Sequence, residues 1–152
     1  MKIIATLAFI MTFILIFQTG CKKENEGSGT STHYSTSSGG MSGNCQQCHT
    51  PGNGEAAAWT VAGTVFNQDL STPSPNGTVY IWKVVSGTWK LVASLEVDAN
   101  GNFYTSNSIL PSGSFYPQVE GASGDLESMP VFCTSGSCNR CHGISQPRIW
   151  VK

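Results

Sequence analysis

The chain has 152 residues with 8 Lys or Arg and 9 Asp or Glu, which gives a formal net charge of −1. Only 11% of the residues are charged and no run of basic residues occurs. This composition argues against nucleic acid as a partner and against a charge-driven membrane surface. The length is enough for about one domain.

The first twenty residues have the pattern of a secretory signal peptide. Lys2 supplies a positive charge, residues 3–17 are almost wholly apolar, and the short run 18–20 precedes Cys21. A transmembrane helix needs roughly 20 apolar residues, so a permanent span is not favoured. The pattern resembles bacterial lipoprotein signals, although Gln18 stands where those signals usually carry an aliphatic residue.

The lipoprotein resemblance implies that Cys21 is lipidated and that the protein binds the membrane through this anchor. We therefore expect a cell-envelope protein, held at the outer membrane and facing the periplasm or the cell surface. The alternative is an ordinary secreted protein with a spare cysteine. In either case export places the cysteines where thiols tend to be oxidised or ligated.

A polar segment follows, rich in Gly, Ser and Thr and without an apolar period, at residues 22–43. This composition is typical of a flexible tether. With Cys21 it forms a lipidated tether over residues 21–43. The folded domain is then expected over residues 44–152.

The middle of the chain carries short runs in which β-branched and aromatic residues alternate with their neighbours. These runs lie at 59–66, 78–83 and 91–96. Ser86-Gly87 fits a tight hairpin turn, and Asn100-Gly101 fits a second one of type I′, which needs positive φ at its central residues. No long helical period occurs. The pattern predicts an all-β fold, a small antiparallel β-sandwich.

Four segments sharpen this prediction: AGTVFNQ (62–68), PNGTVYIWK (75–83), VDANGNFYT (97–105) and FYPQVEG (115–121). In this order they resemble carboxypeptidase-regulatory-like domains. The resemblance implies a transthyretin-like sandwich and little about function, because such domains serve as scaffolds or binding modules. Trp82, Trp89 and Tyr80 offer a carbohydrate platform, but aromatic residues on strands more often serve in packing.

The pattern C-x-x-C-H occurs twice, as CQQCH (45–49), the first motif, and CNRCH (138–142), the second motif. This is the attachment pattern of c-type haem. Two thiols can add to the two vinyl groups of one porphyrin, and the adjacent histidine can then bind the iron. Only three histidines occur in the chain, and two of them directly follow a C-x-x-C.

The two motifs together resemble a dihaem c-type cytochrome, with haem carried by both terminal segments of the domain. The resemblance implies two covalent haems c. It makes thioether residues of the four motif cysteines and proximal iron ligands of the two motif histidines: Cys45, Cys48, Cys138, Cys141, His49 and His142.

Two alternatives remain for the cysteines. The four motif thiols can form a tetrahedral Cys₄ zinc site that joins the two ends of the domain, or they can close two small disulfide loops. Either would make the protein a lipid-anchored binding module. Neither explains why a histidine follows each pair.

Candidates for the sixth iron ligands are His33, Met41 and Met129. His33 is the third histidine, and on a flexible tether it can reach an iron of its own chain or of a neighbouring molecule. Met/His ligation raises the reduction potential. Cys133 lies outside both motifs and is expected to be either a buried apolar residue or an intermolecular disulfide.

We expect an electron-transfer protein rather than an enzyme, because no catalytic set of residues can be named from spacing. Its expected function is one-electron transfer outside the cytoplasm, with redox proteins as partners. Ligation by His33 between molecules would support a homo-oligomer or a chain of haems.

Overall fold

The computed structural model describes residues 43–52, 57–108 and 113–152. The predicted signal peptide, Cys21, His33 and Met41 lie outside these ranges. The described residues form strands and two short 3₁₀ helices, in the order η2 (Cys45–Gln47), β1 (Val61–Asn67), β2 (Thr78–Val85), β3 (Thr88–Glu96), β4 (Asn102–Thr105), β5 (Tyr116–Glu120), β6 (Leu126–Ser128), η3 (Cys138–Arg140) and β7 (Ile149–Val151). No helix in these ranges is long and apolar enough to cross a membrane.

The strands form two sheets, which confirms the all-β prediction. One sheet has three strands in the order β4-β1-β7, and the other has four in the order β3-β2-β5-β6. All pairings are antiparallel except that of β1 with β7, which is parallel. The sheets are therefore mainly antiparallel, as predicted, with one parallel pair that the sequence did not indicate. The further assignment to transthyretin-like domains stays a prediction.

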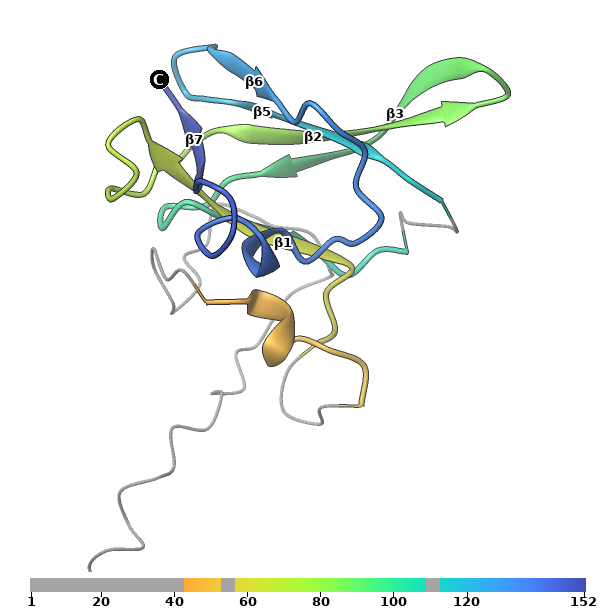
Figure 1. Ribbon diagram of the computed structural model, residues 1–152, viewed down its shortest axis with the longest axis horizontal. Coiled ribbons are helices and arrows are strands. Elements are labelled where there is room, and N and C mark those ends of the chain that lie inside the picture. Colours follow the sequence, from red (N-terminus) through yellow and green to blue (C-terminus); the bar gives the residue numbers. More distant parts are fainter. Residues whose placement is uncertain (1–42, 53–56, 109–112) are drawn as a thin grey trace, which may run out of the picture.

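Apolar side chains from both sheets form a shared core, and Figure 1 shows the two sheets that contribute them. Its buried members come from six of the strands and from two connecting segments: Val61, Val65, Val79, Ile81, Leu95, Val97, Phe103, Phe115, Val119 and Val151. In the four-stranded sheet the predicted alternation holds for β2, where Val79, Ile81 and Lys83 are buried and the residues between them are partly exposed.

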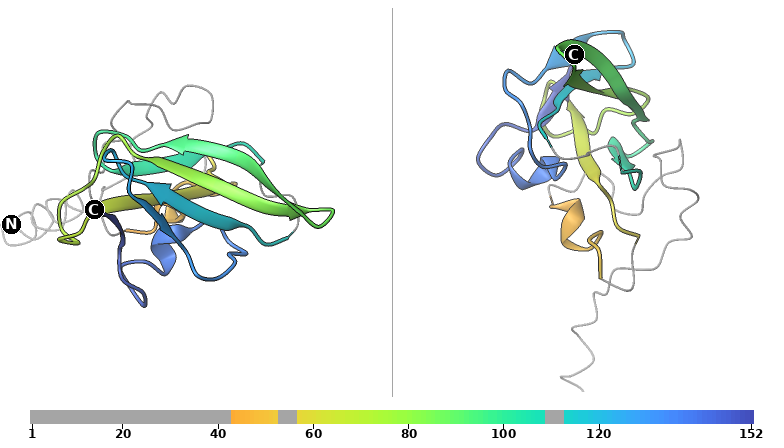
Figure 2. Two further views of the ribbon diagram at one scale, coloured as in Figure 1. Left: turned by 90° about the horizontal axis from the view of Figure 1, so that it is seen from above. Right: turned by 90° about the vertical axis from the view of Figure 1, so that its right-hand side faces the viewer.

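Strand β1 does not show this alternation, because both of its faces are covered. Its first six residues are all buried. One face packs in the core, and Figure 1 shows η2 (orange) and the segment of η3 (blue) on the side of β1 away from the four-stranded sheet. The side view in Figure 2 places β1 between that sheet and η2. The second layer over β1 is therefore made by the two C-x-x-C-H segments.

The two predicted turns have different outcomes. Ser86 and Gly87 both have positive φ, 52° and 77°, in the two-residue loop between β2 and β3, so this hairpin turn is confirmed. The predicted hairpin at Asn100-Gly101 is wrong. Only Gly101 has positive φ, at 78°, and the turn joins β3 of one sheet to β4 of the other.

The turn that changes sheets is held by Asp98, a fully buried residue. Its Oδ1 accepts hydrogen bonds from the amides of Asn100 at 2.9 Å and Asn102 at 2.8 Å. The Gly101 amide also donates to the Asp98 carbonyl at 3.0 Å. One carboxylate oxygen thus satisfies two backbone donors of this turn, and the Asp98 carbonyl satisfies a third.

We expect Asp98→Ala to lower the free energy of unfolding by about 2–3 kcal/mol, because it leaves two amides without an acceptor at a buried site. Asp98→Asn keeps a side-chain oxygen at the same place and should cost less, on the order of 1 kcal/mol. Urea denaturation of the two variants and the wild type measures this order. Equal losses for Ala and Asn would contradict the role given to the side-chain acceptor.

Candidate functional site

The two C-x-x-C-H motifs fold in the same way. Each begins with a single 3₁₀ turn over its first three residues. The amide of the second cysteine donates to the carbonyl of the first, at 3.3 Å in the first motif and 3.2 Å in the second. The histidine amide donates to that same carbonyl at 3.1 Å in both. This helical turn brings residues three and four apart to one side, so both cysteines and the histidine of a motif are held by one turn.

Each motif histidine is also fixed through its side chain. His49 Nδ1 lies 2.9 Å from the Ala57 carbonyl oxygen, and His142 Nδ1 lies 2.6 Å from that of Pro147. A carbonyl oxygen only accepts hydrogen bonds, so Nδ1 must carry the proton in both rings. In the neutral imidazole, Nε2 then keeps its lone pair, which is the form that binds a metal ion.

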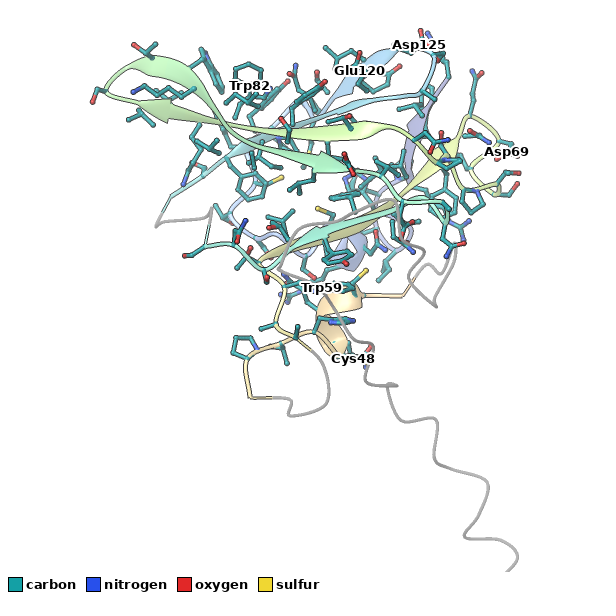
Figure 3. The ribbon with its side chains drawn as sticks, turned by 180° about the vertical axis from the view of Figure 1, so that it is seen from behind. Cys48, Trp59, Asp69, Trp82, Glu120 and Asp125 are labelled. Carbon is teal, nitrogen blue, oxygen red and sulfur yellow. The ribbon has the colours of Figure 1, made fainter. Side chains whose placement is uncertain are left out.

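Aromatic rings hold the plane of the His49 imidazole. Trp59 stacks on it with ring centroids 3.3 Å apart and an interplanar angle of 5°. Tyr104 in turn stacks on Trp59 at 4.2 Å and 16°. Trp59 and Tyr104 are buried and pack with Ala62 of β1. Figure 3 shows Trp59 beside Cys48 at the end of the molecule opposite Trp82.

The two motifs are joined directly to each other. Asn44, which precedes the first motif, accepts a hydrogen bond at its Oδ1 from the Gln46 amide at 3.2 Å and from the Ser137 hydroxyl at 2.6 Å. Ser137 precedes the second motif. One side-chain oxygen therefore caps the first 3₁₀ turn and binds the residue at the start of the second.

Asn139, inside the second motif, is buried and makes more hydrogen bonds between the two motif segments and β1 than Asn44 does. We call these contacts the Asn139 junction. Its Oδ1 accepts from the Thr64 amide at 3.1 Å, and its Nδ2 donates to the Thr64 hydroxyl at 3.0 Å and to the Gly43 carbonyl at 3.2 Å. Nδ2 also lies 3.7 Å from the Cys45 sulfur. This amide thus connects β1, the start of the first motif and η3.

Gly136 allows the second motif to reach β1. Its carbonyl accepts from the Ala62 amide at 2.9 Å, in the part of β1 that precedes the pairing with β7. A Cβ atom at Gly136 would overlap the carbonyl of Thr60. Only glycine permits so close an approach of two backbones without a shift.

The motif cysteines are in different states. Cys45, Cys138 and Cys141 are free thiols. Cys48 is disulfide-bonded. A thioether to haem and a disulfide exclude each other at one sulfur, so haem attachment at the first motif requires Cys48 in its reduced form.

Burial shapes the chemistry of two of these thiols. It raises the pKa of Cys138 to about 12, and it raises the pKa of Cys45 as well. Zinc binds cysteine as the thiolate, whereas a thioether sulfur is uncharged. The described residues gather no group of three or more His, Cys, Asp or Glu side chains that could hold a metal ion.

Cys133 and Met129 lie together beside the core. The Cys133 thiol donates to the Met129 sulfur at 3.2 Å, and the Cys133 backbone pairs with Phe115. Burial, and then the charge of Cys141, raise the pKa of Cys133. The thiol is half-buried and free, as expected for a small residue packed against the core.

Sequence reasoning named all six motif residues but missed Asn44, Trp59, Ser137 and Asn139. Asn139 occupies a variable position of its motif, and its partners are up to 96 residues away, so no local signal marks it. The other two predicted ligands, His33 and Met41, lie outside the described residues. No protein-family model matches the chain, and no curated protein matches its sequence.

We expect Asn139→Ala to lower the free energy of unfolding by about 2–4 kcal/mol, because it leaves the buried Thr64 amide and the Gly43 carbonyl without partners. Arg140→Ala is the matched control. This exposed residue lies in the same motif, and its truncation should change stability by less than about 0.5 kcal/mol. Denaturant unfolding compares the two variants. Equal losses in the free energy of unfolding would contradict the stabilising role given to the Asn139 hydrogen bonds.

Proposed function

We propose that the protein is an extracytoplasmic electron-transfer protein that carries two covalent haems c, one at each motif. The observation that carries the proposal is the shared geometry of the two histidines. Each is held by the same turn as its cysteines, and each donates Nδ1–H to a backbone carbonyl. A structural zinc or disulfide site would not require either histidine to present Nε2.

In this proposal the cysteines of each motif attach the haem and the histidine binds its iron. Cys45 and Cys48 hold one haem by thioether bonds, and Cys138 and Cys141 hold the other. His49 and His142 bind the two irons through Nε2. When bound, haem c supplies reversible one-electron exchange at its iron. The carbonyls of Ala57 and Pro147 keep the proton at Nδ1, which fixes the tautomer and increases the basicity of the ligand nitrogen.

The arrangement of the motifs suits a pair of redox centres. The two attachment segments are hydrogen-bonded to each other through Asn44 and Ser137 and share the same covered side of β1. Both centres would then belong to one rigid part of the domain. Met129 remains our candidate for a sixth ligand near the second motif, and His33 and Met41 are the candidates from the tether.

One observation favours a second candidate function. The disulfide at Cys48 agrees with a lipid-anchored binding module whose first motif is oxidised, while Cys138 and Cys141 at the other end are free thiols. In that case the first motif would bind no haem. The two functions predict different covalent masses for the mature chain.

We expect two haem additions in the intact mass of denatured protein, after expression in a bacterium that attaches c-type haem. Replacing Cys138 and Cys141 together by Ala should remove one addition, because each motif serves one haem. Cys133→Ala is the matched control and should keep both, since Cys133 belongs to neither motif. A pyridine haemochrome spectrum measures the same stoichiometry independently.

A mass equal to the bare polypeptide, with or without zinc, would overturn the haem proposal. A single addition that survives the loss of Cys138 and Cys141 would place haem at the first motif alone. Mass measurement before and after reduction detects the Cys48 disulfide as a shift of two hydrogen atoms in any chain without haem at that motif.

We also propose that lipid on Cys21 anchors the protein to the cell envelope, where it exchanges electrons with redox proteins and, through His33, with further copies of itself. A single acyl chain binds membranes only marginally, so stable anchoring takes more than one. Cys21→Ser should release the protein from the membrane fraction or block its processing. Cys133→Ser should stay with the membranes, and unchanged association of Cys21→Ser would show another anchor.

A further inference from the structure

Aromatic side chains gather on the outer face of the four-stranded sheet, away from the core. Trp82 of β2 pairs in register with Tyr116 of β5, and Trp89 of β3 lies beside them. Trp89 contacts Tyr116 edge-on at 5.7 Å and stacks with Phe132 at 5.9 Å and 9°. Figure 3 shows Trp82 on the side of this sheet that faces away from Trp59 and the first motif.

These rings border an open groove of about 250 Å³, lined by Trp82, Trp89, Tyr116 and Gln118. We call it the aromatic groove. The rings at this groove are accessible to a ligand, because Trp89 is 51% exposed and the adjacent Phe132 is 54% exposed. Large aromatic rings left in water at one place mark a binding surface more often than scattered apolar residues do.

Polar groups accompany the rings along the same sheet face. The Gln118 amide donates to the Ser128 hydroxyl at 2.9 Å, and the Tyr80 hydroxyl donates to Glu120 at 2.5 Å one register step further. The indole N–H of Trp82 is buried and has no acceptor among the described residues. No charged residue lines the groove itself. The groove thus offers flat apolar rings, with amide and hydroxyl groups beside them.

We propose that the aromatic groove binds a pyranose ring of a neutral polysaccharide. One face of a pyranose carries C–H groups that pack on an aromatic ring, while its hydroxyls lie at the edge, where Gln118 and Ser128 can bond them. A purely apolar protein partner would not use these edge groups, and an anionic ligand would find no cation in the groove. The site lies opposite the motifs and does not depend on haem.

The test is affinity electrophoresis of the full mature chain in native gels containing hydroxyethylcellulose, xylan, glucomannan or laminarin. At least one polysaccharide should slow the wild type, and addition of the matching oligosaccharide should change its tryptophan fluorescence. Trp89→Ala should weaken binding at least tenfold, and Trp89→Phe should restore part of it, because a ring is present again. Ile144→Ala, a 71% exposed apolar residue away from the groove, should bind like the wild type.

Two results would overturn the proposal. One is wild-type mobility unchanged in all four polysaccharides. The other is Trp89→Ala that keeps the wild-type circular dichroism spectrum and still binds equally well. If Trp89→Ala instead turns a dimer into a monomer in size-exclusion chromatography without affecting sugar binding, the face is a self-association surface. The haem content of the same samples is scored separately, so failure here leaves the haem proposal intact.

Discussion

The arrangement of both motifs depends on one buried amide, that of Asn139. Its oxygen accepts a hydrogen bond from the Thr64 amide of β1, and its nitrogen donates to the Thr64 hydroxyl and to the carbonyl of Gly43, which precedes the first motif. Because Asn139 and Thr64 are buried, leaving either of them unpaired costs more than the hydrogen bond itself contributes. The junction therefore specifies where the two motif segments lie, and it covers the face of β1 that the core does not use.

Apart from this junction, each motif is also held by contacts within its own segment of the chain. The 3₁₀ turn is made within five residues, and the carbonyl that binds the histidine comes from a short return of the chain, eight residues later in the first motif and five in the second. A histidine that binds iron through Nε2 needs its proton fixed at Nδ1, and a backbone carbonyl fixes the proton there in both motifs. The first motif is in addition held by a stack of aromatic rings.

The molecule also separates two surfaces. The proposed redox segments lie against the three-stranded sheet, and Trp82 of the aromatic groove lies on the outer face of the other sheet (Figure 3). The core between the sheets keeps them apart. A ligand in the groove would therefore leave the motif side open to a redox partner, and the two proposals can be tested on the same protein without interfering.

By itself the sequence determined what is local: the all-β class, the Ser86-Gly87 hairpin, and the cysteines and histidines of the motifs, because each of these depends on residues a few positions apart. Only the tertiary structure decided what is distant. The parallel pairing of β1 with β7, the change of sheet at Asp98 and the Asn139 junction with Thr64, 75 residues away, join segments whose spacing carries no periodic signal. Asparagine at a variable motif position has ordinary local uses, and burial against distant backbone groups gave Asn139 its role here.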